Sequence, residues 1–192
     1  MYVCTSTIGS PTPPLPNTST IGTTTYYVSQ RINSTLCEGP RTAITYTVKP
    51  VPVLVNTNTT PNICSGTTFS FTPQTNVTGV TITWSRSAIA GISNLQVSNS
   101  SVLPISEVLV NTTTAPITVS YQLNFALNGC MSASTITVTV QPKAKLNPTP
   151  SLNNICNGGS FNFTPASQTS GVSYAWTRTL QTGVTGTGAG YN

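Results

Sequence analysis

The side chains that could do chemistry in this sequence are few: five cysteines, two glutamates, and seven lysines or arginines. The 192 residues include no histidine and no aspartate, so the usual Ser-His and Cys-His couples of nucleophilic catalysis cannot be assembled. Glu38 and Glu107 form the single carboxylate pair available to a glycosidase. A calcium site built from several carboxylates is equally unexpected. The sequence therefore predicts a protein that is not an enzyme, with no catalytic residue, no metal ligand set and no cofactor.

Charge and hydropathy exclude two further classes of partner. The net charge of +5 comes from scattered residues without a basic run, whereas a nucleic-acid surface requires a clustered patch. No stretch approaches the ~18 apolar residues of a membrane helix, so we expect no membrane insertion by this segment. The N-terminus lacks the basic and apolar regions of a signal peptide. We therefore expect the chain to be a piece of a larger exported protein.

Composition indicates the elements that position these residues. The chain has 37 Thr and 22 Ser but few Lys, Glu or Ala, the residues that usually cover helix surfaces. Thr, Val, Ile and Tyr suit a pleated, half-buried surface. The sequence is therefore expected to form an all-β protein.

An internal repeat divides the chain. Residues 62–86 match residues 154–178 without a gap, with 12 of 25 positions identical at an offset of 92. Residues 37–50 resemble residues 130–142 at an offset of 92 or 93. We therefore predict a C-terminal half-repeat over 1–50, a complete repeat over 51–142, and an N-terminal half-repeat over 143–192.

Within the complete repeat, apolar residues alternate with polar ones, which is typical of strands with one buried face. Turn signals at Ala90-Gly91 and Asn128-Gly129 separate these runs. About seven short strands in about 92 residues is the size of an immunoglobulin-like β-sandwich. Prolines at the predicted unit boundaries favour stiff, extended joints. The alternating residues are Val80, Ile82, Trp84, Ile117, Val119, Tyr121, Leu123, Phe125, Ile136, Val138 and Val140.

The cysteines indicate an oxidising compartment, because none has zinc-ligand spacing. Cys64 precedes the second strand of the complete unit and Cys130 lies between its last two strands. We therefore expect a disulfide between Cys64 and Cys130, which would contribute about 4 kcal/mol on the chain-entropy estimate. Cys37 and Cys156 are expected to pair outside this segment. Cys4 has no counterpart in the repeat and either pairs with Cys37 or stays unpaired.

Two motifs resemble known modules. The stretch Thr23–Gln30, followed by Cys37–Ile44, resembles immunoglobulin-like modules of large Bacteroidota surface proteins, although Gly39 replaces a serine. Residues 62–86 and 154–178 resemble the PKD-like modules of the same proteins, with Trp84-Ser85-Arg86 in place of the ordinary PKD signature. This resemblance to type IX-secreted giant adhesins, including the SprB type of gliding motility, implies tandem sandwiches displayed outside the cell.

Several single residues have competing interpretations. Trp84 and Trp176 could form sugar-binding platforms, but Trp84 shares its parity with Val80 and is expected in the core. Tyr26 and Tyr27 must point to opposite faces of a strand, so one of them is a candidate ligand or interface residue. Arg86 is a further candidate, with a structural role against an aromatic ring favoured.

Our leading hypothesis is a non-catalytic, extracellular repeat module in the stalk or filament of a large cell-surface adhesin, attached to the outer membrane through its parent. Its expected partners are neighbouring repeats, surface polysaccharide or like filaments. One alternative is an accessory or carbohydrate-binding module of a secreted polysaccharide hydrolase. Another is a surface fibre subunit that assembles by strand complementation.

Overall fold

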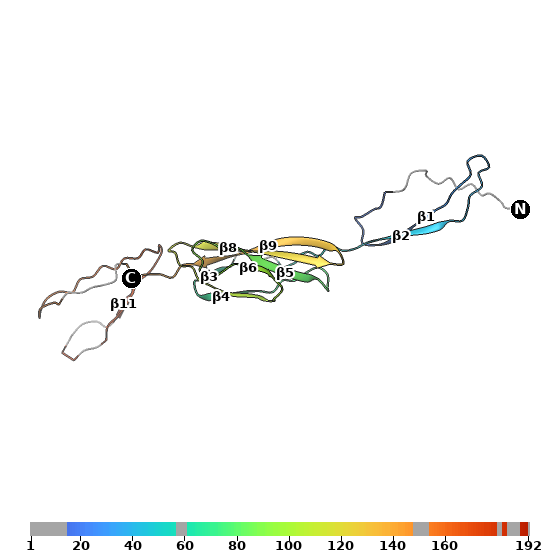
Figure 1. Ribbon diagram of the computed structural model, residues 1–192. Coiled ribbons are helices and arrows are strands. Elements are labelled where there is room, and N and C mark those ends of the chain that lie inside the picture. The colour runs from blue at the N-terminus through green and yellow to red at the C-terminus, as the bar shows by residue number, and fades with distance from the viewer. Residues whose placement is uncertain (1–14, 57–60, 148–153, 180–181, 184–188, 192) are drawn as a thin grey trace.

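The computed structural model describes residues 15–56, 61–147, 154–179, 182–183 and 189–191. These residues form eleven β-strands and no helix, so none of them forms a helix able to cross a membrane. A hairpin precedes the middle unit and a second β-structure follows it (Figure 1). The strands are β1 (Gly22–Val28), β2 (Thr42–Val48), β3 (Asn62–Cys64), β4 (Thr67–Phe71), β5 (Thr81–Arg86), β6 (Val97–Ser100), β7 (Ile105–Leu109), β8 (Ile117–Leu127), β9 (Cys130–Gln141), β10 (Ala175–Thr177) and β11 (Ala189–Tyr191).

The middle unit is a β-sandwich made of two sheets. One sheet has five strands in the order β3-β9-β8-β5-β6, and the facing sheet pairs β4 with β7. All neighbours are antiparallel except β3, which runs parallel to β9 and pairs Cys64 with Gln141. The predicted all-β, immunoglobulin-like sandwich is confirmed. Long β8 and β9 run side by side through eleven residue pairs, from Ile117 opposite Val140 to Leu127 opposite Cys130.

The core lies between the two sheets and follows the predicted alternation. Every second side chain is buried along residues 119–125 of β8 and 136–140 of β9, and the intervening ones are more exposed, because successive residues of a strand point to opposite faces. Phe69 on β4 and Trp84 on β5 both pack on the ring of Tyr121, with centroids 5.2 and 5.7 Å away. The indole Nε1 of Trp84 donates to the carbonyl oxygen of Val102 at 2.9 Å. The buried cluster contains Phe69, Trp84, Ile92, Ile105, Leu109, Val119, Tyr121, Leu123, Phe125, Ile136, Val138 and Val140.

Backbone features recur at the spacing of the sequence repeat. Four glycines of the middle unit adopt positive φ, and for three of them the residue 92 positions later is a glycine that does the same. The isolated bridge between Leu54 and Thr75 has its counterpart in that between Leu146 and Ser167. Since only glycine adopts these φ values without strain, the shared residues reproduce the same turns. The glycine pairs are Gly66 and Gly158, Gly79 and Gly171, and Gly91 and Gly183, with φ of 85° and 80°, 76° and 70°, and 86° and 83°.

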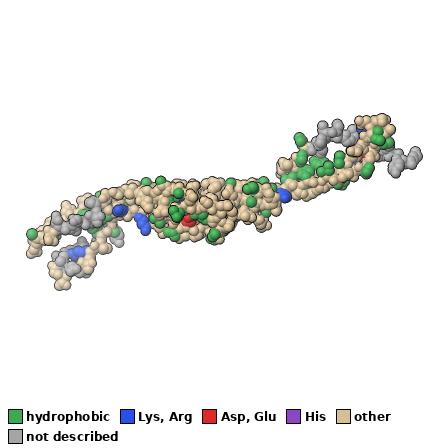
Figure 2. All heavy atoms as spheres, in the orientation of Figure 1, with side chains coloured by type: hydrophobic (Ala, Val, Ile, Leu, Met, Phe, Trp, Pro, Cys, Tyr) green, Lys and Arg blue, Asp and Glu red, His purple; other side chains and the backbone are tan. Residues whose placement is uncertain are grey.

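The N-terminal hairpin is a bare two-stranded sheet. β1 and β2 pair along their whole length, from Gly22 opposite Val48 to Val28 opposite Thr42. No second sheet packs on this hairpin among the described residues, and most of its apolar side chains are exposed (Figure 2). The ammonium group of Lys49 donates to the carbonyl oxygen of Asn128 at 3.0 Å. This bond attaches the hairpin to the β8–β9 turn of the middle unit.

The predicted disulfide between Cys64 and Cys130 is absent, because the topology keeps the two residues apart. Both are free thiols. Cys64 lies opposite Gln141, at the last residue of β9, whereas Cys130 is the first residue of the same strand. Eleven residue steps of a strand span about 36 Å, and a disulfide needs Cα atoms within about 7 Å. The expectation failed because the parallel placement of β3 on β9 could not be seen in the sequence; Cys4 lies outside the described residues.

Candidate functional site

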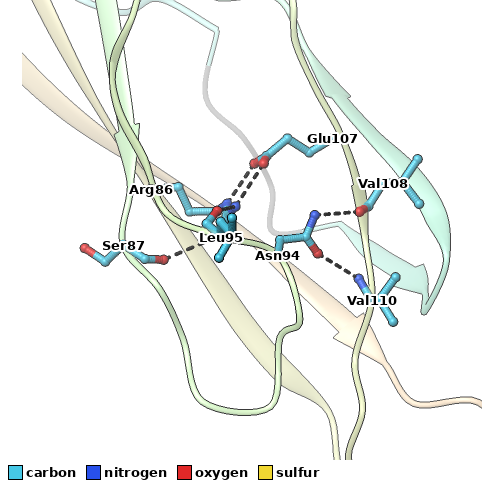
Figure 3. Close-up of polar contacts among 7 residues, drawn as sticks. All are labelled: Arg86, Ser87, Asn94, Leu95, Glu107, Val108 and Val110. Atoms are coloured by element: carbon cyan, nitrogen blue, oxygen red, sulfur yellow. Dashed lines mark hydrogen bonds and ion pairs between the residues drawn. The ribbon is translucent and has the colours of Figure 1, made fainter.

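Arg86, a candidate ligand-binding residue, is buried in the sandwich and 1% exposed. Its guanidinium makes a bidentate pair with Glu107 on β7, with Nε to Oε2 at 2.8 Å and Nη2 to Oε1 at 2.9 Å (Figure 3). Further donated bonds reach the carbonyl oxygens of Ser87 and Leu95. The hydrogen bonds to Glu107 raise the pKa of Arg86. Arg86 therefore ties β5 to the facing sheet and offers no accessible group to a ligand.

The structure gives Glu107 a partner that the sequence did not identify, the guanidinium of Arg86. Its carboxylate also lies beside Tyr121, whose pKa is raised first by burial and then by the adjacent Glu107 side chain. A carboxylate held by an arginine is an ion pair rather than a general base. The only signal in the sequence was compositional, because Arg86 and Glu107 are the single arginine and the single acid of the predicted middle unit.

A second polar cluster, formed by Ser65 and Asn111, joins three chain segments inside the sandwich. The Ser65 hydroxyl donates to the backbone carbonyl oxygen of Asn111 at 3.2 Å and accepts from the backbone amide nitrogen of Asn111 at 2.9 Å. The Asn111 side-chain amide donates to the carbonyl oxygens of Ala115 and Val140, at 2.8 and 2.9 Å. Because each buried polar group here has a partner, the cluster is structural. Sequence reasoning missed it, since Ser and Asn are abundant throughout the chain.

The tyrosine pair on β1 behaves as the alternation predicts. Tyr27 is 67% exposed, and Tyr26 lies on the other face, where its ring stacks on Tyr46 at 5.7 Å. Val28 and Ile44, on the face of Tyr26, are 51% and 54% exposed. This face is therefore an open apolar surface. We call these four side chains, Tyr26, Val28, Ile44 and Tyr46, the hairpin face.

The C-terminal part of the chain contains an apolar groove with a volume of about 220 Å³. Trp176 on β10 is 37% exposed there, and its ring meets Phe163 edge-on at 5.6 Å. Trp84 confirms the core prediction, whereas Trp176 lies on an open surface. The groove is lined by Leu146, Phe161, Phe163, Pro165, Tyr174, Ala175 and Trp176. It offers shape and apolar contact but no charged group for chemistry.

Glu38 and Arg41 form an ion pair at the surface, with Nε to Oε1 at 2.9 Å. The hydrogen bond from Arg41, with a second one from the Ser29 hydroxyl, lowers the pKa of Glu38. Arg41 is half exposed, so the pair contributes little to stability. Among the described residues, no three His, Cys, Asp or Glu side chains gather as a metal site would require.

Comparison with protein families finds a match within the middle unit. Residues 61–144 match the family of PKD-like domains. The matched stretch contains all strands of the two packed sheets, from β3 to β9. This part of the chain is thus similar to PKD-like domains, in agreement with its all-β, immunoglobulin-like sandwich. Comparison with curated proteins gives no match to the chain.

Proposed function

We propose that this chain is a non-catalytic, extracellular repeat module in the stalk of a large cell-surface adhesin. The observation that carries the proposal is the recurrence of the same turns and bridges at a spacing of 92 residues, around a unit similar to PKD-like domains. Repeated sandwiches joined by short proline-containing segments extend a chain with little added chemistry. Gliding motility and type IX secretion are the finer proposals, and they rest on the resemblance of residues 23–30, 37–44, 62–86 and 154–178 to modules of such adhesins.

The joints support a role in extension. Ahead of the middle unit, Pro52 is fully buried and its carbonyl oxygen accepts a hydrogen bond from the Ser132 hydroxyl of β9. The Asn76 side chain accepts from the Val53 amide at 2.8 Å. Hydrogen bonds therefore fix the segment entering the unit to its body. A fixed entry segment transmits direction from one unit to the next better than a free linker does.

The residues of the middle unit also speak against a sugar-binding module at Trp84. An aromatic platform needs an accessible ring, but Trp84 is 5% exposed and packs on Tyr121. Arg86 is engaged by Glu107. Neither candidate is therefore available to a polysaccharide at this place.

The test is to identify the native parent polypeptide. Intact cells are treated with protease, and peptides of this sequence are assigned to a full-length protein by mass spectrometry. We expect a parent of several thousand residues that is lost from the surface on treatment. A parent of enzyme size with a histidine- and aspartate-containing domain would overturn the proposal and favour an accessory module. Cells lysed before treatment serve as the control for intracellular protein.

A further inference from the structure

We propose that the middle unit carries tension along the chain, and that the contact bearing the load is the parallel ladder of β3 on β9, held in register by the Ser65–Asn111 cluster. The inference deepens the proposed stalk function and rests on it for its biological meaning, because a stalk is pulled by its two ends. Resistance to force is a property of the folded unit itself. Its absence would leave the identity of the parent protein undecided, and an unexpected parent would leave the resistance to force standing.

The chain enters and leaves the middle unit at opposite ends of the sandwich. At the entry, Lys49 donates to the carbonyl oxygen of Asn128 in the β8–β9 turn. β9 begins after this turn at Cys130 and ends at Gln141, where the chain leaves the unit. The N-terminal hairpin and the C-terminal part accordingly lie beyond opposite ends of the middle unit (Figure 1). Tension on the two flanking segments therefore acts along β9.

The position of β3 converts this tension into shear. The Pro52 carbonyl oxygen accepts from Ser132, near the start of β9, whereas Cys64 lies opposite Gln141 at the end of β9. The chain thus advances in the direction of β9 before β3 joins that strand in parallel. Tension pulls β3 back toward the entry and the end of β9 forward toward the exit. Parallel strands pulled in opposite directions slide along each other, so their evenly spaced hydrogen bonds share the load.

The ladder extends beyond the three residues of β3. On one side, the Thr139 amide donates to the Pro61 carbonyl oxygen at 2.9 Å. On the other, the Ser65 amide donates to the Gln141 carbonyl oxygen at 2.9 Å. The side chain of Ile63, in the middle of β3, packs against the core. Backbone bonds therefore hold β3 to β9 on both sides of a residue that is anchored in the sandwich.

The Ser65–Asn111 cluster fixes the register of this ladder. Both residues are buried, at 3% and 6% exposed. Asn111 holds the end of β3 through its two backbone bonds with the Ser65 hydroxyl. It holds the end of β9 through the bond from its side chain to the Val140 carbonyl oxygen. Sliding by one residue, about 3.3 Å, would break both contacts and leave buried polar groups unpaired, which is costly.

The contacts ahead of β3 are weaker, so we expect them to separate first under load. Two asparagine side chains, Asn56 and Asn76, connect residues 51–56 to residues 72–76 by four hydrogen bonds. All four bonds are exposed, and water replaces such bonds at little net cost. The load then passes to the buried ladder.

The test pulls the full chain by its two termini and holds it at constant force, since forced unfolding reports the unfolding rate. Unfolding of residues 62–141 should lengthen the chain by about 280 Å, because an extended residue spans at most about 3.6 Å, and this step identifies the middle unit. The β1–β2 hairpin is the internal reference. Tension meets its paired ends, Gly22 and Val48, and opens it pair by pair. We expect the middle unit to unfold only at a force well above the one that opens the hairpin.

Ser65→Ala and Ser85→Ala form a matched pair of substitutions. Ser65→Ala removes the bonds to Asn111, and we expect the unit to unfold about tenfold faster at the same force, as for the loss of a buried hydrogen-bonding group. The Ser85 hydroxyl accepts from the Asn99 amide, between β5 and β6 and away from β3 and β9. Its removal should change the rate less than about threefold. Circular dichroism checks both folds.

A second attachment changes the direction of the load and leaves the ladder intact. With the other four cysteines replaced by serine, the chain is held by the exposed thiol of Cys64 and by its C-terminus. Because Cys64 and Gln141 lie opposite each other, tension now pulls the two strands apart sideways, and we expect unfolding at a lower force. A unit that unfolds as easily as the hairpin, or at the same force in both directions, overturns the proposal. So does a Ser85→Ala variant that unfolds as fast as Ser65→Ala.

Discussion

When the middle unit folds, it removes the charged side chains of Arg86 and Glu107 from water. Arg86 lies on β5 of the five-stranded sheet, and Glu107 lies on β7 of the facing sheet. The guanidinium pairs with the carboxylate through two nitrogen–oxygen contacts, at 2.8 and 2.9 Å. Asn94 adds bonds to the backbone of β7 and of the residue that follows it, donating to the Val108 carbonyl oxygen at 2.8 Å and accepting from the Val110 amide just after the strand at 3.2 Å (Figure 3). The two sheets are thus joined by directional hydrogen bonds, which fix their relative position more specifically than an apolar contact would.

Removing one partner of this pair should destabilise the protein more than removing both. Arg86→Met leaves Glu107 without its partner, and we expect the free energy of unfolding to fall by about 3 kcal/mol. The double variant Arg86→Met with Glu107→Leu should recover most of this loss, since two apolar side chains replace the pair. Urea unfolding followed by tryptophan fluorescence measures both. Arg41→Met, which breaks an exposed pair with Glu38, is the control and should change stability by less than about 1 kcal/mol.

Two substitutions at Tyr121 can separate what its ring and its hydroxyl each contribute to the stability of the middle unit. Its side chain is fully buried, and its Oη has no hydrogen-bond partner of good geometry among the described residues. Tyr121→Phe should therefore keep stability within about 1 kcal/mol of the parent. Tyr121→Ala should lose about 3–5 kcal/mol, because the rings of Phe69 and Trp84 lose their shared contact. Thermal unfolding distinguishes them, and equal losses in both variants would contradict this account of the hydroxyl.

At the scale of elements, the turns set the register of the sheets. Gly91 follows β5 with φ of 86°, and a Cβ there would lie 2.6 Å from both Ile117 Cδ1 and Thr113 Cγ2. Gly129 in the β8–β9 turn has φ of 87° but nothing within 4 Å of such a Cβ. The two glycines therefore share backbone conformation and differ in the space around them.

This difference gives a matched pair of substitutions. Gly129→Ala should cost about 1 kcal/mol, the strain of a side chain in the left-handed region. Gly91→Ala should cost at least about 1 kcal/mol more, because Ile117 and Thr113 must also move. Chemical denaturation of the two variants in parallel measures the gap. Equal losses would mean that the contact at Gly91 relaxes without cost.

The elements themselves could be predicted from the sequence, but the contacts between distant elements could not. Alternation along residues 117–125 and 136–140 fixed which side chains are buried, because a strand with one wet face leaves a period of two. The Arg86–Glu107 pair spans 21 positions, and the Ser65–Asn111 cluster spans 46. No local pattern marks such pairs. They depend on which sheet a strand joins, and the parallel position of β3 was not visible in the sequence.

The same reasoning explains the two candidate surfaces. Tyr26 could be placed on a strand and opposite in direction to Tyr27, because that follows from alternation alone. That its ring meets the ring of Tyr46 on the same face required the register of β1 on β2. Phe161 and Trp176 could be matched to Phe69 and Trp84 by the repeat, but their exposure depended on which strands cover them.

At the scale of the whole molecule, the cysteines mark the two ends of the middle unit. Cys130 begins β9 next to the turn that contacts Lys49, and Cys64 lies where β9 ends, before Lys143. A disulfide formed by either residue would connect the unit to a neighbour across a joint. It would not connect the two sheets of the sandwich to each other. The stability of the sandwich must therefore come from packing and from the buried polar clusters.

Alkylation of the folded protein tests this arrangement. We expect iodoacetamide to label Cys64 under native, non-reducing conditions, because its side chain is exposed and its thiol is free. Cys130, which is half-buried, should react more slowly and fully only after unfolding. Peptide mass spectrometry reports each site, and a Cys64→Ser variant controls for labelling elsewhere. A mass two hydrogens lower in a peptide pair containing Cys64 and Cys130 of one chain would contradict the register of β3 on β9. Because stability should not depend on that bond, reductant should leave the unfolding midpoint of the middle unit unchanged.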